Sequence, residues 1–338
     1  MMSIRTELEA MEHLHLGPRA AFADETKGRL HPEELRADDM RTAYQRDTDK
    51  IVHSKAFRRL MHKTQVFLSP EGDHYRTRMT HTLEVARIAR TVTKALNLNE
   101  DLSEAIAMGH DLGHTPFGHA GEIALSEAMG QPFRHNEQSL RVVDLLEKQG
   151  EGLNLTYEVR MGILGHTGPQ VPDTLEGRIV RWADRVAYVN HDIDDAIRAG
   201  ILNDDDLPKF VRRTLGTTHS GRINTLVCDM IIASRDRGDI CFSEPVEQAL
   251  QQLREFMFER VYRNPVAKGE ESKAREMLKR LYDYYFNHPE ALPDDFQPQM
   301  SLEGMERTVC DYIAGMTDNY AVDKYTQIFI PAGWQIRG

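Results

Sequence analysis

Apolar residues recur every three or four positions along most of the chain, which is the spacing of amphipathic helices, and strand-like alternation is nearly absent. The pattern predicts a strong helix from about residue 80 to 97 and a second over 100–113, with Asp101 as its N-cap and Gly113 as its stop. A third helix is expected to start at His119. Further helices are predicted over 136–150, 174–200, 205–215, 219–236, 244–263, 268–287 and 302–315.

These helices indicate a mostly α fold in three parts. Residues 1–35 are polar with little periodicity, which predicts an N-terminal arm. Residues 36–235 form the predicted helical catalytic core, and residues 236–338 form a smaller C-terminal helical subdomain that packs on it. Proline-containing breaks such as "NPVAKG" and "HPEALPDDFQP" separate the later helices.

The charge balance limits what the chain can bind. Its 338 residues carry 53 acidic and 42 basic side chains, a net charge of −11, so the surface is poorly suited to coating nucleic acid. An anionic ligand must therefore be held by a local basic cluster. No apolar run approaches a membrane span and no export signal opens the chain, so we expect no membrane partner. Three widely spaced cysteines indicate a reducing cytoplasm and exclude a cysteine-based zinc site.

The stretch "GHDLGHTPFGH", residues 109–119, concentrates three histidines beside one aspartate. Its glycines and proline stop the helix, so His114 and His119 are predicted to project from a loop, where core packing does not require imidazoles. His110 and Asp111 are neighbours whose side chains point about 100° apart on a helix, so they share one ion only if it lies over the helix end. An imidazole beside a carboxylate suits a borderline divalent cation.

Further ligands have to come from elsewhere, and His81 and Asp184 are candidates. The ordinary alternatives are a buried, singly hydrogen-bonded histidine and a capping or salt-bridging aspartate. Arg78 lies three residues before His81 and shares its side of a helix, while Tyr188 and Asp192 follow Asp184 along one helix face. A core tyrosine and a surface acid are the ordinary interpretations of that pair. A structural role does not account for all of these residues together.

These residues carry a resemblance to a known superfamily. His81, the His110–Asp111 pair and Asp184 reproduce the H…HD…D pattern of the HD-domain metal-dependent phosphohydrolases. More narrowly, "RDTDKIVHSKAFRRLMHKTQVF", "RTRMTHTLEVARIAR", "GHDLGHTPFGHAGE", "RHNEQSL" and "ADRVAYVNHDIDDA" resemble successive blocks of the dGTPase-like deoxynucleoside triphosphate triphosphohydrolases. The blocks run in order over residues 46–195, and "REFMFERVYRNP" extends the similarity to residue 265. The resemblance implies an HD-type catalytic core.

The resemblance also implies roles for individual residues. The implied metal ligands are His81, His110, Asp111 and Asp184. The implied catalytic residues, near the triphosphate and the attacked phosphorus, are His114, His119, Glu122 and His135. Gln65 matches a residue that reads the 3′-hydroxyl of the sugar. The residues implied to hold the phosphates and the deoxyribose are Arg78, Arg185, Tyr188, Asp192, Arg254 and Tyr262.

The activity implied by the resemblance is metal-dependent hydrolysis of a dNTP, with dGTP a candidate, to a deoxynucleoside and inorganic triphosphate. The ion (Mg²⁺, Mn²⁺, Fe²⁺ or Co²⁺) would activate a water that attacks the α-phosphorus, and His119 or His114 would protonate the leaving 5′-oxygen, with His119 preferred. Relatives commonly assemble, so a homo-oligomer is expected. Single-stranded nucleic acid remains a further partner to test.

Two alternatives stay open from the sequence. The chain is another HD phosphohydrolase, such as a nucleoside monophosphatase or a cyclic-nucleotide phosphodiesterase, or it is a catalytically idle nucleotide- or nucleic-acid-binding module on an HD scaffold. Intact metal ligands, the additional histidines and the acidic charge balance weigh against the idle module. The base, the metal and regulation by a second nucleotide are left open by the sequence.

Overall fold

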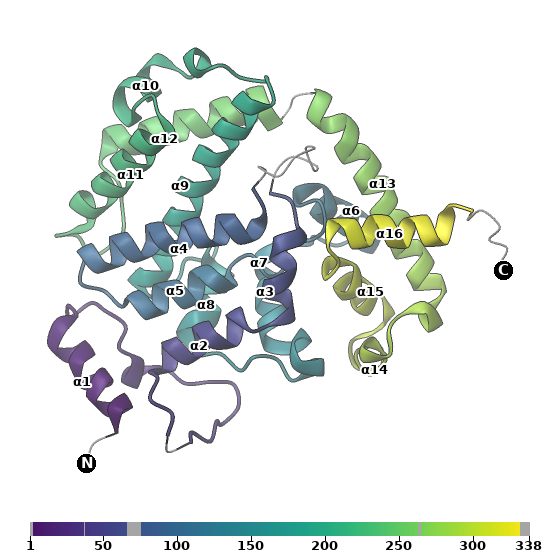
Figure 1. Ribbon diagram of the computed structural model, residues 1–338, viewed down its shortest axis with the longest axis horizontal. Coiled ribbons are helices and arrows are strands. Elements are labelled where there is room, and N and C mark those ends of the chain that lie inside the picture. The colour runs from purple at the N-terminus through teal and green to yellow at the C-terminus, as the bar shows by residue number, and fades with distance from the viewer. Residues whose placement is uncertain (1–2, 37, 66–75, 263–264, 332–338) are drawn as a thin grey trace, which may run out of the picture.

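The computed structural model describes residues 3–36, 38–65, 76–262 and 265–331, with the side chains of residues 204 and 262–269 outside the description. Helices make up its secondary structure (Figure 1), and within the described ranges there is no strand, only two isolated bridges, Arg29 to Thr156 and Thr64 to Thr77. The predicted mostly α fold class is confirmed.

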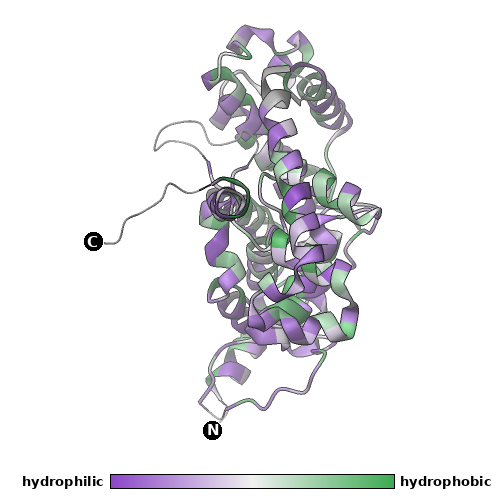
Figure 2. Cartoon of the chain, turned by 90° about the vertical axis from the view of Figure 1, so that its right-hand side faces the viewer, coloured by the Kyte–Doolittle hydropathy of each residue, from purple (hydrophilic) through white to green (hydrophobic). Residues whose placement is uncertain are grey.

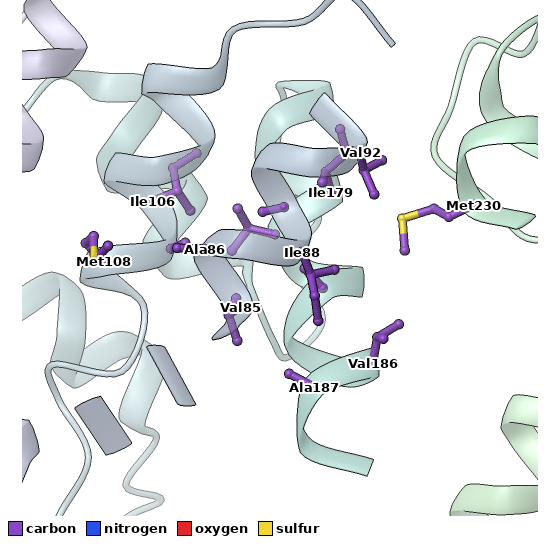
Figure 3. Close-up of a cluster of buried hydrophobic side chains, with 14 of the residues drawn as sticks. Val85, Ala86, Ile88, Val92, Ile106, Met108, Ile179, Val186, Ala187 and Met230 are labelled. Carbon is purple, nitrogen blue, oxygen red and sulfur yellow. The ribbon is translucent and has the colours of Figure 1, made fainter. Parts of the chain in front are cut away.

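The centre of the molecule is a group of helices packed on one another. It consists of α2 (Ala43–Val52), α4 (Arg78–Ala95), α5 (Glu100–Gly109), α8 (Tyr157–Gly165) and α9 (Leu175–Arg198). Each of α4, α5 and α9 contacts the other two. Figure 3 shows their buried side chains meeting, among them Val85 and Ile88 of α4, Ile106 of α5 and Ile179 of α9.

The formation of α4 shows how the sequence positions the later site. Thr77 is its N-cap, and the Thr77 side chain accepts a hydrogen bond from the backbone N–H of Thr80. Val85, Ala89 and Val92 recur at helical spacing and are completely buried, so this face must point into the core. Since His81 lies four residues before Val85, core packing carries its imidazole to the same side of the helix.

A second hydrophobic cluster joins the C-terminal helices to α6 (His119–Met129). Ala124 and Leu125 of α6 pack there with residues of α13 (Pro265–Asn287), α15 (Met305–Ala314) and α16 (Asp318–Phe329). In Figure 1 these three C-terminal helices lie together on the right. The helix that begins at His119 is therefore fixed by the C-terminal region.

The remaining α-helices surround these two clusters. Helices α10, α11 and α12 lie together at the upper left of Figure 1, and α11 and α12 contact α9. The α-helices not yet given are α1 (Ile4–His15), α3 (Lys55–Arg59), α7 (His135–Arg141), α10 (Lys209–Leu215), α11 (His219–Ser234), α12 (Glu244–Met257) and α14 (Gln297–Glu303). Figure 2 shows hydrophilic and hydrophobic residues interspersed along the helices. None of the described helices is both long and apolar enough to cross a bilayer.

Several predicted boundaries were wrong. Asn99, not Asp101, caps α5, because the Asn99 side chain accepts hydrogen bonds from the N–H groups of Asp101 and Leu102. The predicted helix start at His119 is confirmed, so His119 projects from the first turn of α6 and not from the loop before it. The helix predicted over 136–150 breaks after α7 into a π-helix (Val142–Leu146) and a short 3₁₀ turn.

The N-terminal stretch has more structure than its sequence pattern indicated. It contains α1, which Ser3 caps, and beyond α1 the buried Ala20 and Ala23 join the main hydrophobic cluster. The division into an arm, a core and a C-terminal subdomain stays a prediction.

Candidate active site

Four proposed metal ligands converge from three helices. His81 comes from α4, His110 and Asp111 lie at the end of α5, and Asp184 lies within α9. His81 Nε2 is 3.1 Å from Asp184 Oδ1, and His110 Nε2 is 3.4 Å from Asp111 Oδ1. One ligand atom each from His81, His110 and Asp111 lies within 4.8 Å of the others, and His110 Nε2 lies 3.9 Å from Asp184 Oδ1. The packing of the three helices thus gathers two imidazoles and two carboxylates.

The His110 ring shows what this centre is suited to hold. Its Nδ1 lies 2.7 Å from the carbonyl oxygen of Ala107, so Nδ1 carries the hydrogen and Nε2 presents a lone pair. Nε2 is buried and has no hydrogen-bond partner among the described residues. A lone pair facing the oxygens of Asp111 and Asp184 is stabilised by a cation between them. The donor set of imidazole nitrogens and carboxylate oxygens fits a divalent ion.

Both carboxylates of the centre are ionised near neutral pH. Burial alone would raise the pKa of Asp111, but His110, His114 and the Arg78 guanidinium lower it well below its ordinary value. For Asp184, burial is again opposed, here by the hydrogen bond from His81 and the neighbouring imidazoles, and the pKa falls below its ordinary value. The centre therefore offers two negative charges to a cation.

A second polar group is organised by Glu122 of α6. Glu122 Oε1 lies 2.6 Å from His135 Nδ1, and Glu122 Oε2 lies 3.1 Å from His119 Nδ1. Although burial would raise the pKa of Glu122, the hydrogen bonds from His119 and His135 lower it strongly. The hydrogen bond to Glu122 raises the pKa of His119, whose side chain is 80% exposed. His119 is thus a solvent-accessible imidazole that favours its protonated form.

His114 links this group to the four proposed metal ligands, His81, His110, Asp111 and Asp184, which together are called the metal-type centre below. It is buried, and its Nε2 lies 3.2 Å from Asp111 Oδ1. Burial, followed by the charges of Arg78 and His135, lowers the pKa of His114 well below its ordinary value, so the ring is neutral. Ligand atoms of Asp111, His114 and His135 also lie within 4.8 Å of one another. The His114 and His135 rings stack, with centroids 3.9 Å apart and planes at 15°. Lone pairs in nearly parallel planes converge poorly on one ion, which favours hydrogen bonding here.

The backbone of the turn between α5 and α6 is tightly constrained. Phe117 has φ 60°, a left-handed conformation that non-glycine residues adopt only when the surroundings hold them there. Gly113 is required by close packing, because a Cβ at this position would lie 2.1 Å from the backbone nitrogen of Ser139. The turn thus aims His114 and His119 from a strained and closely packed backbone.

Two of the predicted substrate-binding residues lie beside this turn. Arg78 is buried, and it donates one hydrogen bond from NH1 to Asp111 Oδ2 at 3.0 Å and one from NH2 to the backbone oxygen of Gln65 at 3.3 Å. The Gln65 side-chain oxygen is buried and finds no hydrogen-bond partner in the part of the chain that the structure describes. An arginine and an unsatisfied amide therefore lie next to the metal-type centre.

The other predicted substrate residues are found along α9 and α12. The Arg185 guanidinium lies over the Trp182 ring, 4.7 Å from its centroid. Burial raises the pKa of Tyr188, and the nearby Arg254 opposes that shift, so Arg254 of α12 lies against Tyr188. Asp192 is buried in α9 and is not the surface acid of the ordinary alternative. The Tyr262 side chain lies outside the described residues.

Sequence reasoning missed a buried histidine next to the histidine group that Glu122 organises. His166 follows α8, and its Nδ1 donates to the carbonyl oxygen of Ile163 at 2.7 Å, which leaves Nε2 as an acceptor. That Nε2 lies 3.1 Å from His135 Nε2. Burial, with the charges of His110 and His135, lowers the pKa of His166 to about 3, so it is neutral. The signal was "GHTGP", a histidine at a helix end followed by glycine and proline, as in the main motif.

A second missed histidine, His191, lies behind the metal-type centre on α9. Its Nε2 is 2.5 Å from Glu84 Oε2, and its ring meets the His81 ring edge-on at 5.7 Å. Glu84 lies three residues after His81 and His191 seven after Asp184, so both share a helix face with a proposed ligand. That spacing could have revealed the pair.

Comparison with known families agrees with this arrangement. A family profile described as HD domain matches residues 78–189, which contain all four proposed ligands, and one described as phosphohydrolase-associated domain matches residues 240–327. Fold and site together define an HD-domain protein. Among solved structures, a hypothetical protein from Aquifex aeolicus is 19% identical with a TM-score of 0.44, and the alignment covers 84% of this chain and 71% of that chain.

Full-length relatives narrow the class. A deoxyguanosinetriphosphate triphosphohydrolase-like protein of Caldanaerobacter subterraneus subsp. tengcongensis is 53% identical, and the alignment covers 98% of each chain. A protein of the same name from Clostridium perfringens (strain 13 / Type A) is 48% identical, with 98% of each chain covered. The chain belongs to the deoxyguanosinetriphosphate triphosphohydrolase-like family. The resemblance predicted from the sequence blocks is confirmed.

Proposed function

We propose that this protein hydrolyses a deoxynucleoside triphosphate to a deoxynucleoside and inorganic triphosphate in a reaction that depends on a divalent ion. The observation that carries the proposal is His110 Nε2, which has no hydrogen-bond partner among the described residues and faces two ionised carboxylates beside a glutamate-linked pair of histidines. The names of the full-length relatives support the substrate class.

His81, His110, Asp111 and Asp184 are the residues that would hold the ion. When bound, a divalent ion supplies Lewis acidity, which polarises a phosphoryl oxygen and lowers the pKa of water. The ligand types suit Mn²⁺, Fe²⁺ or Co²⁺, and Mg²⁺ is a further choice.

Proton transfer to the leaving 5′-oxygen falls to His119 in this proposal. Its Nδ1 is held by Glu122, which raises the pKa of His119 and leaves the proton on Nε2 free to be delivered. The neutral His114 cannot serve as this acid near neutral pH, because its pKa is well below the ordinary value. His114 instead orients toward Asp111, and its stacked neighbour His135 is held between Glu122 and His166.

The nucleotide is held by charge and shape in the same proposal. Arg78 contacts the phosphates from the floor of the site, and Arg185 and Arg254 approach from α9 and α12. Tyr188 packs under the deoxyribose. The side-chain oxygen of Gln65, buried without a described partner, accepts a hydrogen bond from the 3′-hydroxyl.

Product analysis tests the proposal. The full chain is incubated with each dNTP and Mg²⁺ or Mn²⁺, and early products are resolved by anion exchange, with Asp111→Ala as the inactive control. Intact triphosphate and deoxynucleoside are expected in equal amounts, without dNDP or dNMP. Orthophosphate as the first product would place the attack at the γ end, and dNMP as the first product would make the protein a different phosphohydrolase.

A further inference from the structure

A carboxylate from the C-terminal region lies against the turn between α5 and α6. Asp318, the first residue of α16, is only 6% exposed. Its Oδ1 accepts a hydrogen bond from the backbone N–H of Phe117 at 3.0 Å. Its Oδ2 accepts two, from the backbone N–H of Thr64 at 2.9 Å and from the Thr64 hydroxyl at 2.6 Å. One carboxylate therefore ties together two segments that are far apart in the sequence.

Each of these segments carries a residue of the proposed site. Thr64 precedes Gln65, whose backbone oxygen is held by Arg78, and Thr64 also pairs with Thr77 at the start of α4. Phe117 has the left-handed φ of 60° and comes two residues before His119. Because a non-glycine residue holds such a φ only when its surroundings enforce it, the bond to Phe117 helps to fix the turn.

A second link runs parallel to the first. Lys63 is buried, and its Nζ donates to the backbone oxygen of Ala314 at 2.8 Å and to the backbone oxygen of His114. The junction between α15 and α16 thus holds the turn near both of its ends, at His114 through Lys63 and at Phe117 through Asp318. This junction lies inside the region matched by the phosphohydrolase-associated domain.

Capping of α16 does not explain these bonds. An acidic residue in the first turn is favourable for any helix, but the capping hydrogen bond of α16 is made by Thr317, whose side-chain oxygen accepts from the N–H of Tyr320 at 3.2 Å. The three bonds of Asp318 leave its helix and end on Thr64 and Phe117.

We infer that Asp318 is a positioning residue that fixes Gln65 and His119 relative to each other. The 3′-hydroxyl contact and the proton donation then act on the same bound nucleotide. The inference rests on the proposed function. The described hydrogen bonds of Asp318 end on Thr64 and Phe117 and not on a proposed metal ligand, so Asp318 acts through these two segments. In this role the C-terminal region helps to position residues of the proposed active site.

The test compares Asp318→Asn with Thr317→Ala, its neighbour in the same helix start. Asparagine keeps the size of Asp318 but turns an amide N–H₂ toward an N–H donor, so one of the two segments is released. Because small displacements of reacting groups are costly, Asp318→Asn should lower kcat/KM about 10–100-fold while its metal content stays at the wild-type level. Thr317→Ala should lower Tm and leave kcat/KM unchanged. An equal loss of kcat/KM in both variants, or no loss in Asp318→Asn, would overturn the inference.

A variant of Thr64 tests the bond from Asp318 to Thr64 separately from its bond to Phe117. Thr64→Val removes only the hydroxyl bond to Asp318 Oδ2 and keeps the shape, whereas Thr64→Ser keeps the hydroxyl. The valine variant should lose part of the preference for a dNTP over its 2′,3′-dideoxy analogue, because the segment that carries Gln65 has lost one of its two bonds to Asp318, and the serine variant should keep it. If valine and serine behave alike, the hydroxyl bond has no positioning role.

Hydrogen exchange keeps this test independent of the substrate. Amide exchange should rise in Asp318→Asn at Phe117 or at Thr64, whichever N–H loses its acceptor, and should stay at the wild-type level at both in Thr317→Ala. If the wild-type chain hydrolyses no dNTP, the proposed function fails, and exchange at Phe117 and Thr64 then decides whether Asp318 holds the two segments. Unchanged exchange at both amides in Asp318→Asn overturns the inference whatever the substrate is.

Discussion

The metal-type centre and the Glu122-linked histidine group lie side by side, yet they are held in different ways. His81, His110 and Asp184 are placed by helices whose apolar side chains pack in the main hydrophobic cluster. His114 and His119 lie on or next to a turn with a left-handed residue, which bonds from Lys63 and Asp318 secure. The proposed ion site is thus placed mainly by helix packing, whereas the proposed proton-transfer group also uses long-range hydrogen bonds from Lys63 and Asp318.

The largest effect is expected from breaking the ion site. Asp111→Ala removes one of its two ionised carboxylates, so tight metal binding and turnover should both be lost. Elemental analysis of the purified variant and the rate of triphosphate release measure the two losses. A chelator should lower the Tm of the wild-type chain, since a ligand bound only by the folded state stabilises it, and should leave Asp111→Ala unaffected. A variant that keeps stoichiometric metal and the full rate contradicts the ligand assignment.

Removing a histidine of the Glu122-linked group should lower kcat without removing the metal, which is a smaller effect than loss of the ion site. His119→Ala is expected to keep its metal and to lose about 10²–10⁴-fold in kcat, the usual contribution of general acid–base catalysis. His81→Ala, the matched histidine of the ion site, should lose metal as well. Equal metal content in the two purified variants would mean that their roles are exchanged.

The preference for deoxyribose over ribose tests the part of the proposed site that α9 forms. A tyrosine ring packed under the deoxyribose leaves no room for a 2′-hydroxyl, so the wild-type chain should prefer a dNTP to its rNTP by about 10–100-fold in kcat/KM. Tyr188→Ala should narrow that ratio, mainly by weakening the dNTP, whereas Gln65→Ala should leave it unchanged. Equal hydrolysis of both nucleotides by the wild-type chain would contradict the sugar pocket.

The smallest effect is a shift in pH dependence. The hydrogen bond to Glu122 raises the pKa of His119, and the proposed acid must be protonated, so activity should fall as pH rises through that raised pKa. Glu122→Gln removes the carboxylate that raises the pKa of His119 and should therefore move this alkaline limb of kcat to lower pH. An unmoved limb in Glu122→Gln would show that another group supplies the proton.

The sequence indicated which candidate ligands lie together better than it indicated the contacts that support them, for a physical reason. His81, His110, Asp111 and Asp184 belong to strongly periodic helices, and the family resemblance named them as metal ligands; the structure brings them together, and their role as ligands stays a prediction. The cap of α5 was misplaced by two residues because Asn99 and Asp101 are both good capping residues, and only the geometry shows which side chain accepts the N–H bonds.

Long-range contacts explain what the sequence left out. The bond between Thr64 and Asp318 joins residues 254 positions apart, and no local pattern indicates such a pairing. His166 was missed for the same reason, since its neighbour His135 lies on another helix. Helical periodicity showed which face of each helix is buried, but which side chains meet across helices depends on tertiary packing.

The central claim is that water attacks the α-phosphorus while His119 protonates the 5′-oxygen. Hydrolysis of a dNTP in water labelled with heavy oxygen, followed by mass spectrometry of both products, tests it most directly. The label is expected in the inorganic triphosphate, and the deoxynucleoside should stay unlabelled. Label in the deoxynucleoside would mean attack at the sugar carbon, and label in released orthophosphate would mean attack at the γ-phosphorus; either result contradicts the account.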